Sequence, residues 1–205
     1  TTVVEGSAAD DTLTSGAGDE LIDGGAGNDT AVYADDLDDV AFAADGAGVR
    51  ITTGTAGTDT LESVETVLLG GGLSGALSVS GGRVSVAYAD AEGERGWTSL
   101  ERTYDDGGLV EETRVRPNGD GETITFHADG SVASRLFTDG ADDNGWASYR
   151  IETREDGSVS RQFWVYDDLE EVERLIAAAG TQTRGRTDAG YGANVSVRTG
   201  TGAPP

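Results

Sequence analysis

The sequence predicts an all-β protein, in which a short parallel β-roll over residues 1–74 precedes an antiparallel β-meander over residues 75–205 with one helix near its C-terminal side. Three observations support this prediction. Nine-residue units repeat without a break from Gly6 to Val32. Short β-prone segments then alternate with Asp-Gly turns, and one amphipathic segment follows them. A short fixed period indicates a solenoid, whereas strands separated by such turns indicate hairpins.

The nine-residue units read GSAADDTLT, SGAGDELID and GGAGNDTAV. Position six is acidic in each unit, and position eight is apolar; the residues are Asp11, Glu20 and Asp29, and Leu13, Ile22 and Ala31. Glycine permits the backbone conformations of tight turns. We therefore expect each unit to form a turn over its first six positions and a short strand over its last three, with the position-eight side chain pointing inward.

This pattern resembles the RTX, or haemolysin-type calcium-binding, repeat G-G-x-G-x-D-x-U-x, where U is a large aliphatic residue. Two successive repeats make one coil, so we expect Asp11 and Asp29, 18 residues apart, to face each other across one calcium ion. Calcium takes six to eight oxygen ligands, main-chain carbonyls among them. The ligand set that the resemblance implies is Ser7, Ala9, Asp11, Gly24, Ala26 and Asp29.

A second site is expected to be less well formed. Its lower turn contains Gly16 and Gly18, but position six is Glu20, whose extra methylene pushes the carboxylate deeper into the site. The residue 18 positions further on is Asp38. Its frame, residues 33–41, keeps an acid at position six but contains no glycine. We therefore expect one well-formed site and one compromised site.

The roll is expected to end in a capping hairpin. Two apolar segments, residues 40–42 and 49–51, flank turn residues at 45–48, which predicts a β-hairpin. A fourth nine-residue frame follows at residues 54–62, with Asp59 at position six. A hairpin followed by such a frame looks like the end of RTX rolls, so the resemblance covers about residues 6–69. The glycine run Gly70–Gly72 then predicts a domain boundary near residue 74.

Residues 75–205 resemble no named family. Seven strands are expected, at residues 83–88, 97–104, 110–115, 123–126, 131–138, 146–153 and 158–166. The segment Asp168–Glu171 has the pattern of a helix-capping box. The apolar residues that follow recur at helical spacing up to Ala179, and Gly180 is a suitable helix stop. The sequence therefore predicts a helix over about residues 168–179.

The composition restricts the partners of the protein. The 205 residues carry a net charge of −24, with 38 acidic against 14 basic residues, and every basic residue is Arg. Such a charge repels nucleic acids and anionic membranes and suits divalent cations, although a plainly soluble or salt-adapted surface is an alternative. The sequence has no Cys and no apolar run of membrane-spanning length. It also has no Met, so we expect it to be part of a larger protein.

No catalytic motif is present in the sequence. The lone histidine, His127, lacks a second His or any Cys with which to form a zinc or Cys-His centre. Carboxylate pairs are abundant, but none is singled out for glycosidase chemistry. We therefore expect no active site in this chain. Four aromatic residues, Trp97, Trp146, Trp164 and Tyr166, could bind a sugar ring; the alternative is that they pack in a two-layer core.

The function predicted from the sequence is a calcium-binding, secreted RTX module whose folding is driven by extracellular calcium. The resemblance implies export by a type I route, and we expect the module to be the C-terminal part of a larger exported protein. Two alternatives remain open. Residues 75–205 could bind carbohydrate or a cell surface, or the chain could be the non-catalytic end of a secreted hydrolase or lyase.

Overall fold

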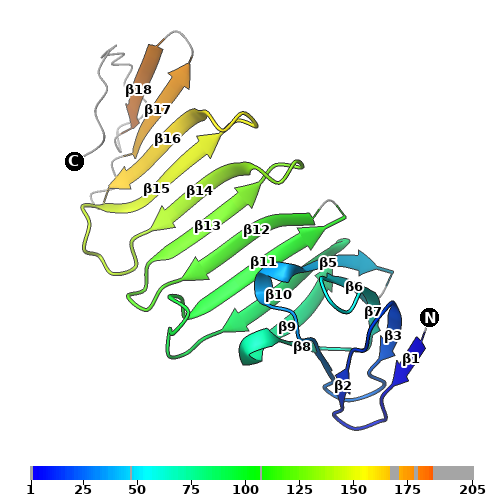
Figure 1. Ribbon diagram of the computed structural model, residues 1–205. Helices are drawn as coiled ribbons and strands as arrows, with labels where there is room; N and C mark the ends of the chain where they lie inside the picture. Colours follow the sequence, from blue (N-terminus) through cyan, green and yellow to red (C-terminus); the bar gives the residue numbers. More distant parts are fainter. Residues whose placement is uncertain (1, 47, 107, 167–170, 178–179, 187–205) are drawn as a thin grey trace. The chain divides into compact units, whose positions relative to one another are not determined.

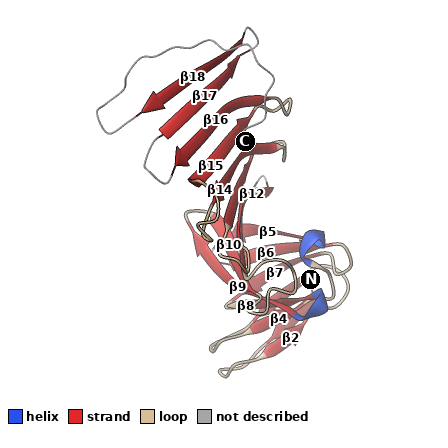
Figure 2. Ribbon diagram, turned by 90° about the vertical axis from the view of Figure 1, so that its left-hand side faces the viewer, coloured by secondary structure: helices blue, strands red, loops and turns tan. Residues whose placement is uncertain are grey.

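The protein is built almost entirely of β-strands (Figure 1). The computed structural model describes residues 2–46, 48–106, 108–166, 171–177 and 180–186. The chain divides into two compact units, Thr1–Arg114 and Val115–Pro205. The helical elements among the described residues are two short 3-10 segments, η1 (Leu37–Asp39) and η2 (Gly70–Gly72), drawn in blue in Figure 2. No helix in this part of the chain is long and apolar enough to span a membrane.

The first unit contains twelve described strands: β1 (Thr2–Glu5), β2 (Thr12–Thr14), β3 (Glu20–Asp23), β4 (Thr30–Val32), β5 (Val40–Asp45), β6 (Gly48–Thr53), β7 (Thr58–Glu62), β8 (Thr66–Leu69), β9 (Leu73–Ser80), β10 (Arg83–Ala89), β11 (Ser99–Asp105) and β12 (Gly108–Val115). They form two sheets. One has the order β1-β3-β7-β6-β5, and the other contains β2-β4-β8-β9-β10-β11-β12. The expected all-β fold is thus confirmed.

The first strands of both sheets pair in parallel with the predicted period of 18 residues. Thr2 of β1 lies opposite Glu20 of β3, and Thr12 of β2 lies opposite Thr30 of β4. Strands β7 and β8 continue the two ladders, with Ile22 opposite Leu61 and Ala31 opposite Val67. The position-eight side chains of Ile22 and Ala31 are fully buried, as the repeat predicts. The nonapeptides therefore form a two-sheet parallel β-roll.

The predicted hairpin is inserted between the second and third coils of the roll, after β4 and before β7. Strands β5 and β6 pair antiparallel, and β6 then pairs with β7 at the edge of the roll. The glycine run η2 joins β8 to β9, which also pair antiparallel, with Leu69 opposite Leu73. Ser74, near which the sequence predicts a domain boundary, is the second residue of β9.

The second unit contains an antiparallel meander: β13 (Gly121–Phe126), β14 (Val132–Thr138), β15 (Trp146–Thr153), β16 (Val159–Tyr166), β17 (Glu171–Ala177) and β18 (Gly180–Arg186). Each of these strands pairs with its neighbour in sequence. The strands expected between residues 123 and 166 are therefore confirmed, with ends that differ by a few residues.

The helix expected over about residues 168–179 is wrong for the residues that the structure describes. Glu171–Ala177 forms strand β17, which pairs with β16 on one side and β18 on the other. The rest of the predicted helix, residues 168–170 and 178–179, lies outside the described residues. Helical spacing of apolar residues is a weak preference, and two neighbouring strands that offer main-chain partners outweigh it. Gly180, the expected helix stop, begins β18 instead.

Candidate metal centre

The turns of the roll bring carboxylates together in pairs. Each turn connects a strand of one sheet to a strand of the other, and position six of each repeat lies where the turn ends. Because the strands stack with an 18-residue period, the position-six acid of one coil lies beside that of the next coil on the same side. The roll therefore has two rows of carboxylates, one on each side.

Asp11 and Asp29 form the first pair, as predicted from the sequence. The Asp11 main-chain N–H donates to Oδ1 of Asp29 at 2.8 Å, and the Thr30 N–H donates to the Asp11 carbonyl at 2.9 Å. Oδ2 of Asp11 accepts hydrogen bonds from both the main-chain N–H and the hydroxyl of Ser7, at 2.5 and 2.7 Å. These two hydrogen bonds, the hydroxyl's first, hold the pKa of Asp11 below its usual value. Asp11 is therefore a carboxylate at neutral pH.

Asp29 is the buried member of this pair. Its exposed fraction is 1%, and its Oδ2 atom is buried and has no hydrogen-bond partner among the described residues. A buried carboxylate oxygen without a donor or cation costs a large desolvation free energy. The Asp29 side chain is therefore suited to a cation that would sit beside Oδ2.

The main chain of the facing turns approaches closely at the same place. A Cβ atom at Gly6 would lie 2.2 Å from the Gly24 carbonyl oxygen. A Cβ at Gly25 would lie 2.2 Å from the Ser7 carbonyl oxygen, and Gly25 has a φ of +91°. Glycine at both positions therefore lets the turns stack with their carbonyl groups close together, which supplies hard oxygen ligands of the type that calcium prefers.

The other predicted main-chain ligands lie in these two turns. The Ser7 carbonyl accepts a hydrogen bond from the Ala26 N–H at 3.1 Å. A Cβ at Gly27 would lie 2.8 Å from the carbonyl carbon of Ala9. Among the described residues, no three side chains of His, Cys, Asp or Glu gather into a metal-binding group. A metal ion at this position would therefore depend on two carboxylates supplemented by main-chain oxygens.

Glu20 and Asp59 form a second pair on the other side of the roll. The Glu20 N–H donates to Oδ1 of Asp59 at 2.9 Å, which reproduces the contact between Asp11 and Asp29. The Gly16 N–H donates to Oε2 of Glu20 at 3.0 Å, and the Gly18 N–H donates to the Ala56 carbonyl at 2.7 Å. Two carboxylates thus meet between two glycine-containing turns here as well.

The second pair has more protein donors than the first. The Ser15 hydroxyl lies 2.8 Å from Oδ2 of Asp59 and 3.2 Å from Oε2 of Glu20. The Tyr33 hydroxyl donates to Oδ2 of Asp59 at 3.0 Å. Burial, followed by the negative charge of Asp59 and its hydrogen bond, raises the pKa of Tyr33 far above its usual value. Tyr33 therefore stays protonated and remains a donor to the second pair.

The structure places Asp59, rather than the expected Asp38, opposite Glu20. Oδ1 of Asp38 instead accepts a hydrogen bond from Nη2 of Arg102 at 2.7 Å, and the Asp38 side chain is 85% exposed. The reason is the inserted hairpin. It delays the next coil, so the partner of Glu20 lies 39 residues further on rather than 18.

Three further acids that the sequence reasoning missed connect the coils. Oδ1 of Asp10 accepts the Asn28 N–H at 2.9 Å, and Oδ1 of Asp19 accepts the Thr58 N–H at 3.0 Å. Oε2 of Glu65 accepts the Asp29 N–H at 2.8 Å. A signal was available for Glu65, since the sequence acid-Thr-aliphatic recurs at Asp11-Thr12-Leu13, Asp29-Thr30-Ala31, Asp59-Thr60-Leu61 and Glu65-Thr66-Val67.

Three of the four aromatic residues considered for sugar binding have described side chains, and none of these three is exposed. Trp97 and Trp164 are buried, with exposed fractions of 8% and 7%. Trp146 is half-buried and contacts Tyr149 edge-on, and Tyr149 also stacks on Trp164 at 4.9 Å between ring centroids. The side chain of Tyr166 lies outside the described part of the structure. The described rings pack mainly against protein groups.

His127 lies at a hairpin turn of the second unit. Its Nε2 atom lies 3.2 Å from the carbonyl oxygen of Thr153. This contact places the ring against the main chain at the end of β15.

Comparison with known proteins agrees with the geometry of the roll. The family model "RTX calcium-binding nonapeptide repeat (4 copies)" matches residues 2–31. No curated protein matches the chain. Fold and match together identify a calcium-binding repeat module in the first coils of the β-roll. More particularly, the chain carries RTX nonapeptide repeats, which bind calcium ions and are a structural module rather than a catalytic one.

Proposed function

We propose that calcium binds between Asp11 and Asp29, and that this binding folds the roll after export from the cell. The observation that carries the proposal is the Oδ2 atom of Asp29, which lies beside the Asp11 turn and is buried without a hydrogen-bond partner in the described part of the chain. The ligands of this first site are the two carboxylates and the main-chain oxygens of Ser7, Ala9, Gly24 and Ala26. The facing glycine-containing turns approach each other closely, and their main-chain oxygens lie on the same side of the roll as the two carboxylates.

The mechanism is the linkage between binding and folding. Without an ion, the paired carboxylates repel each other, and ordering the glycine-rich turns costs conformational entropy. An ion that binds only the folded roll adds about 2.7 kcal/mol of stability at one hundred times its Kd. Extracellular calcium modules work with a Kd of about 10⁻⁴–10⁻³ M, so the roll would stay unfolded in a cell that keeps calcium far lower.

We also propose a second, weaker calcium site between Glu20 and Asp59. Both side chains are buried and lie in turns that repeat the hydrogen bonds of the first site. This site is weaker because Ser15 and Tyr33 already donate to its carboxylate oxygens. Asp38, which is bound to Arg102, is not part of it.

RTX repeat proteins are typically secreted by type I systems, which supports an extracellular location for this protein. We propose that the chain is the C-terminal part of a larger exported protein. In that arrangement, calcium outside the cell would favour the folded module and so oppose its return through the export channel.

A calcium titration of the full chain tests the proposed function. Circular dichroism should show a gain of β structure between chelator and about 1 mM calcium. Isothermal titration calorimetry should detect two classes of ion, and the Glu20→Gln substitution should remove only the weaker class. Equal β structure in chelator and in calcium would contradict calcium-driven folding. Loss of both classes in Glu20→Gln would contradict two separate sites.

A further inference from the structure

The strands that follow the roll bury their inner side chains in the same core as the roll. In β10, Val84, Val86 and Tyr88 are buried, and they alternate with residues of the opposite face that are more exposed. These three side chains belong to one continuous cluster that also contains Ile22 and Leu61 of the roll. Strands β9–β11 therefore have no separate core of their own among the described residues.

The inserted hairpin supplies the layer against which β10 and β11 pack. Strand β5 contacts both of these strands. Phe42 of β5 and Tyr104 of β11 are both buried, with their ring centroids 5.3 Å apart. The hairpin is fixed to the roll by the pairing of β6 with β7. Unfolding of the roll would therefore expose the apolar inner face of β10 and β11 to water, which is unfavourable.

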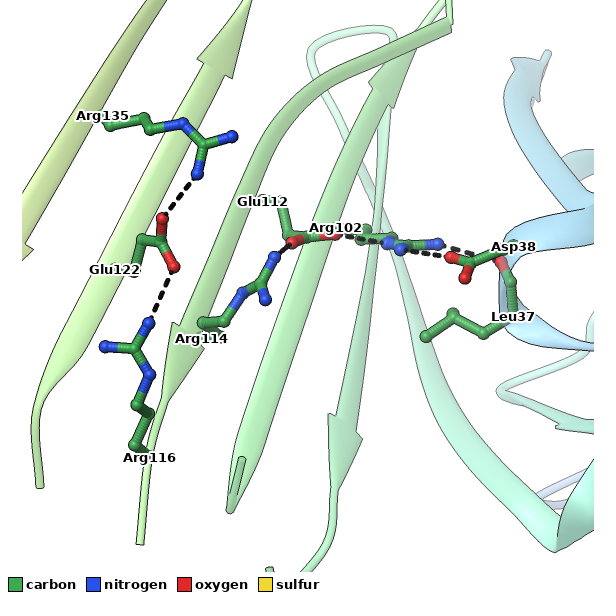
Figure 3. A network of polar contacts seen from close by, with 8 residues as sticks. All are labelled: Leu37, Asp38, Arg102, Glu112, Arg114, Arg116, Glu122 and Arg135. Atoms are coloured by element: carbon green, nitrogen blue, oxygen red, sulfur yellow. Dashed lines mark hydrogen bonds and ion pairs between the residues drawn. The ribbon is translucent and has the colours of Figure 1, made fainter. Parts of the chain in front are cut away.

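A polar contact joins the same two parts. Arg102 of β11 reaches the short helix η1, which connects the roll to the hairpin (Figure 3). Its Nη1 donates to the Leu37 carbonyl at 2.9 Å, its Nη2 to Asp38 at 2.7 Å, and its Nε to Glu112 of β12 at 2.8 Å. We call this set of contacts the Arg102 bridge.

The Arg102 bridge is partly shielded from water. The side chains of Arg102 and Glu112 are 14% and 6% exposed, and Glu112 also pairs with Arg114. A planar guanidinium that binds three partners fixes their geometry in a way that a lysine cannot. Shielded charge-assisted hydrogen bonds are stronger than those at an open surface. The Arg102 bridge therefore ties the order of β11 and β12 to the order of the loop that leaves the roll.

We propose that calcium binding in the roll also folds strands β9–β12, so that the calcium-responsive unit extends to about residue 114. The inference rests on the proposed calcium-driven folding of the roll. The shared core couples the folding of β9–β12 to the folding of the roll. The Arg102 bridge strengthens this coupling at β11 and β12. Glu112, Arg102 and Phe42 thereby transmit an event in the nonapeptides to strands that contain no repeat.

Hydrogen–deuterium exchange of the full chain, in chelator and in calcium, tests this inference. Calcium should slow exchange at least about tenfold both in the repeats, residues 6–32, and in β10 and β11. Protection of the repeats without any change in β10 and β11 would overturn the inference and leave the proposed function intact. An unchanged exchange rate in the repeats themselves would instead show that the proposed function has failed.

The Arg102→Lys variant distinguishes the contribution of the Arg102 bridge from that of the shared apolar core. It keeps the charge but cannot hold all three partners, so the calcium-induced protection of β11 should become several-fold smaller while the repeats still respond. Arg83→Gln is the matched control, because Arg83 is an exposed arginine of β10. Full wild-type protection of β11 in Arg102→Lys, or an equal loss in Arg83→Gln, would overturn the role given to the bridge.

Asp38→Asn is a milder variant, which tests the Arg102 bridge in case Arg102→Lys causes a general folding defect. Since the Asp38 side chain is mostly exposed, its substitution should leave the fold intact. It should weaken the protection of β11 less than Arg102→Lys does and leave the number of bound calcium ions unchanged. Asp39→Asn removes a neighbouring exposed carboxylate and should change neither the protection of β11 nor the number of bound calcium ions. A fall in ion number in Asp38→Asn alone would overturn the inference, because Asp38 would then act as a metal ligand.

Discussion

Asp29 has a buried carboxylate oxygen that no hydrogen-bond donor among the described residues satisfies. Its Oδ1 accepts a hydrogen bond from the Asp11 N–H, but no group that the structure describes donates to its Oδ2, although the residue is almost completely buried. Asp59, which is equally buried, differs in that Ser15 and Tyr33 donate to its Oδ2. The two sides of the roll therefore differ in how strongly they need a cation, although their backbones repeat the same contacts.

We predict opposite effects of Asp29→Asn in chelator and in calcium. In chelator the substitution removes a buried charge that the folded roll must accommodate, so folding of the calcium-free roll should become less unfavourable by about 1–3 kcal/mol. In calcium the first site loses a ligand charge, so its Kd should rise about tenfold or more, or about 1.4 kcal/mol. Circular dichroism of the variant and the wild type in chelator measures the first effect, and calorimetric titration with calcium measures the second.

Asp39→Asn is the control for this prediction, because Asp39 is exposed and precedes β5. It should change neither quantity by more than a few tenths of a kcal/mol. If Asp29→Asn lowered stability equally in both buffers, Asp29 would be a structural acceptor and not a calcium ligand.

Two hairpin turns of the second unit share one hydrogen-bond pattern. In each, a carboxylate accepts from the N–H of the serine two residues later, Asp129 from Ser131 and Asp156 from Ser158, both at 2.9 Å. The hydroxyl and the N–H of these serines hold the pKa of both aspartates below the usual value. The Asp-Gly-Ser sequence thus specifies the turn through its side chains as well as through glycine.

We predict that Ser131→Ala raises the pKa of Asp129 toward its ordinary value of about 3.9. Because the folded-state pKa is depressed, the carboxylate contributes stability above the unfolded-state pKa. That contribution is lost as the pH falls through the folded-state pKa. The variant should therefore be less stable than wild type above about pH 4, and the difference should shrink below it. NMR titration of the Asp129 carboxyl and melting curves between about pH 2 and 6 measure this.

Ser158→Ala should act on Asp156 in the same way, whereas Ser148→Ala, in the neighbouring strand β15, should leave the Asp129 pKa unchanged. An unchanged Asp129 pKa in Ser131→Ala would mean that the turn does not depend on this hydrogen bond in solution.

Elements with a strong local signal could be predicted from the sequence. The nonapeptides, the hairpin at residues 40–53 and the strands between Asp-Gly turns each have a repeating pattern or a turn residue that acts within a few residues. The segment Glu171–Ala177 has apolar residues that fit a helix as well as a strand, and its strand neighbours decide between the two. Local preference cannot reveal a partner that is supplied by the rest of the sheet.

At the scale of the whole molecule, the sequence could not predict which residues pair on the two sides of the inserted β5–β6 hairpin. The pairing of Asp11 with Asp29 follows from an uninterrupted count of 18 residues. The pairing of Glu20 with Asp59 spans the hairpin, whose length the repeat does not specify. The same limit applies to Glu112 and Glu122, each of which is buried between two arginines of the sheet (Figure 3). Those ion pairs depend on which residues of neighbouring strands lie opposite each other, and this register cannot be derived from the amino-acid composition.

The net charge of −24 raises a further question about how calcium acts on the whole protein. Calcium could fold the roll by coordination, or it could merely screen the repulsion among 38 acidic residues. About 1 M NaCl shortens the Debye length to about 3 Å and so screens exposed charges without supplying a coordinating ion. Screening by salt acts weakly on the Asp29 carboxylate, because its exposed fraction is only 1%.

We therefore predict that about 1 M NaCl in chelator gives only a small part of the β structure that about 1 mM calcium gives. Magnesium at the same concentration as calcium should also be less effective, because it demands a near-octahedral shell and releases its water reluctantly. Circular dichroism in the four buffers measures the difference. If NaCl folded the chain as fully as calcium does, general screening would suffice, and the carboxylate pairs would not have to be calcium sites.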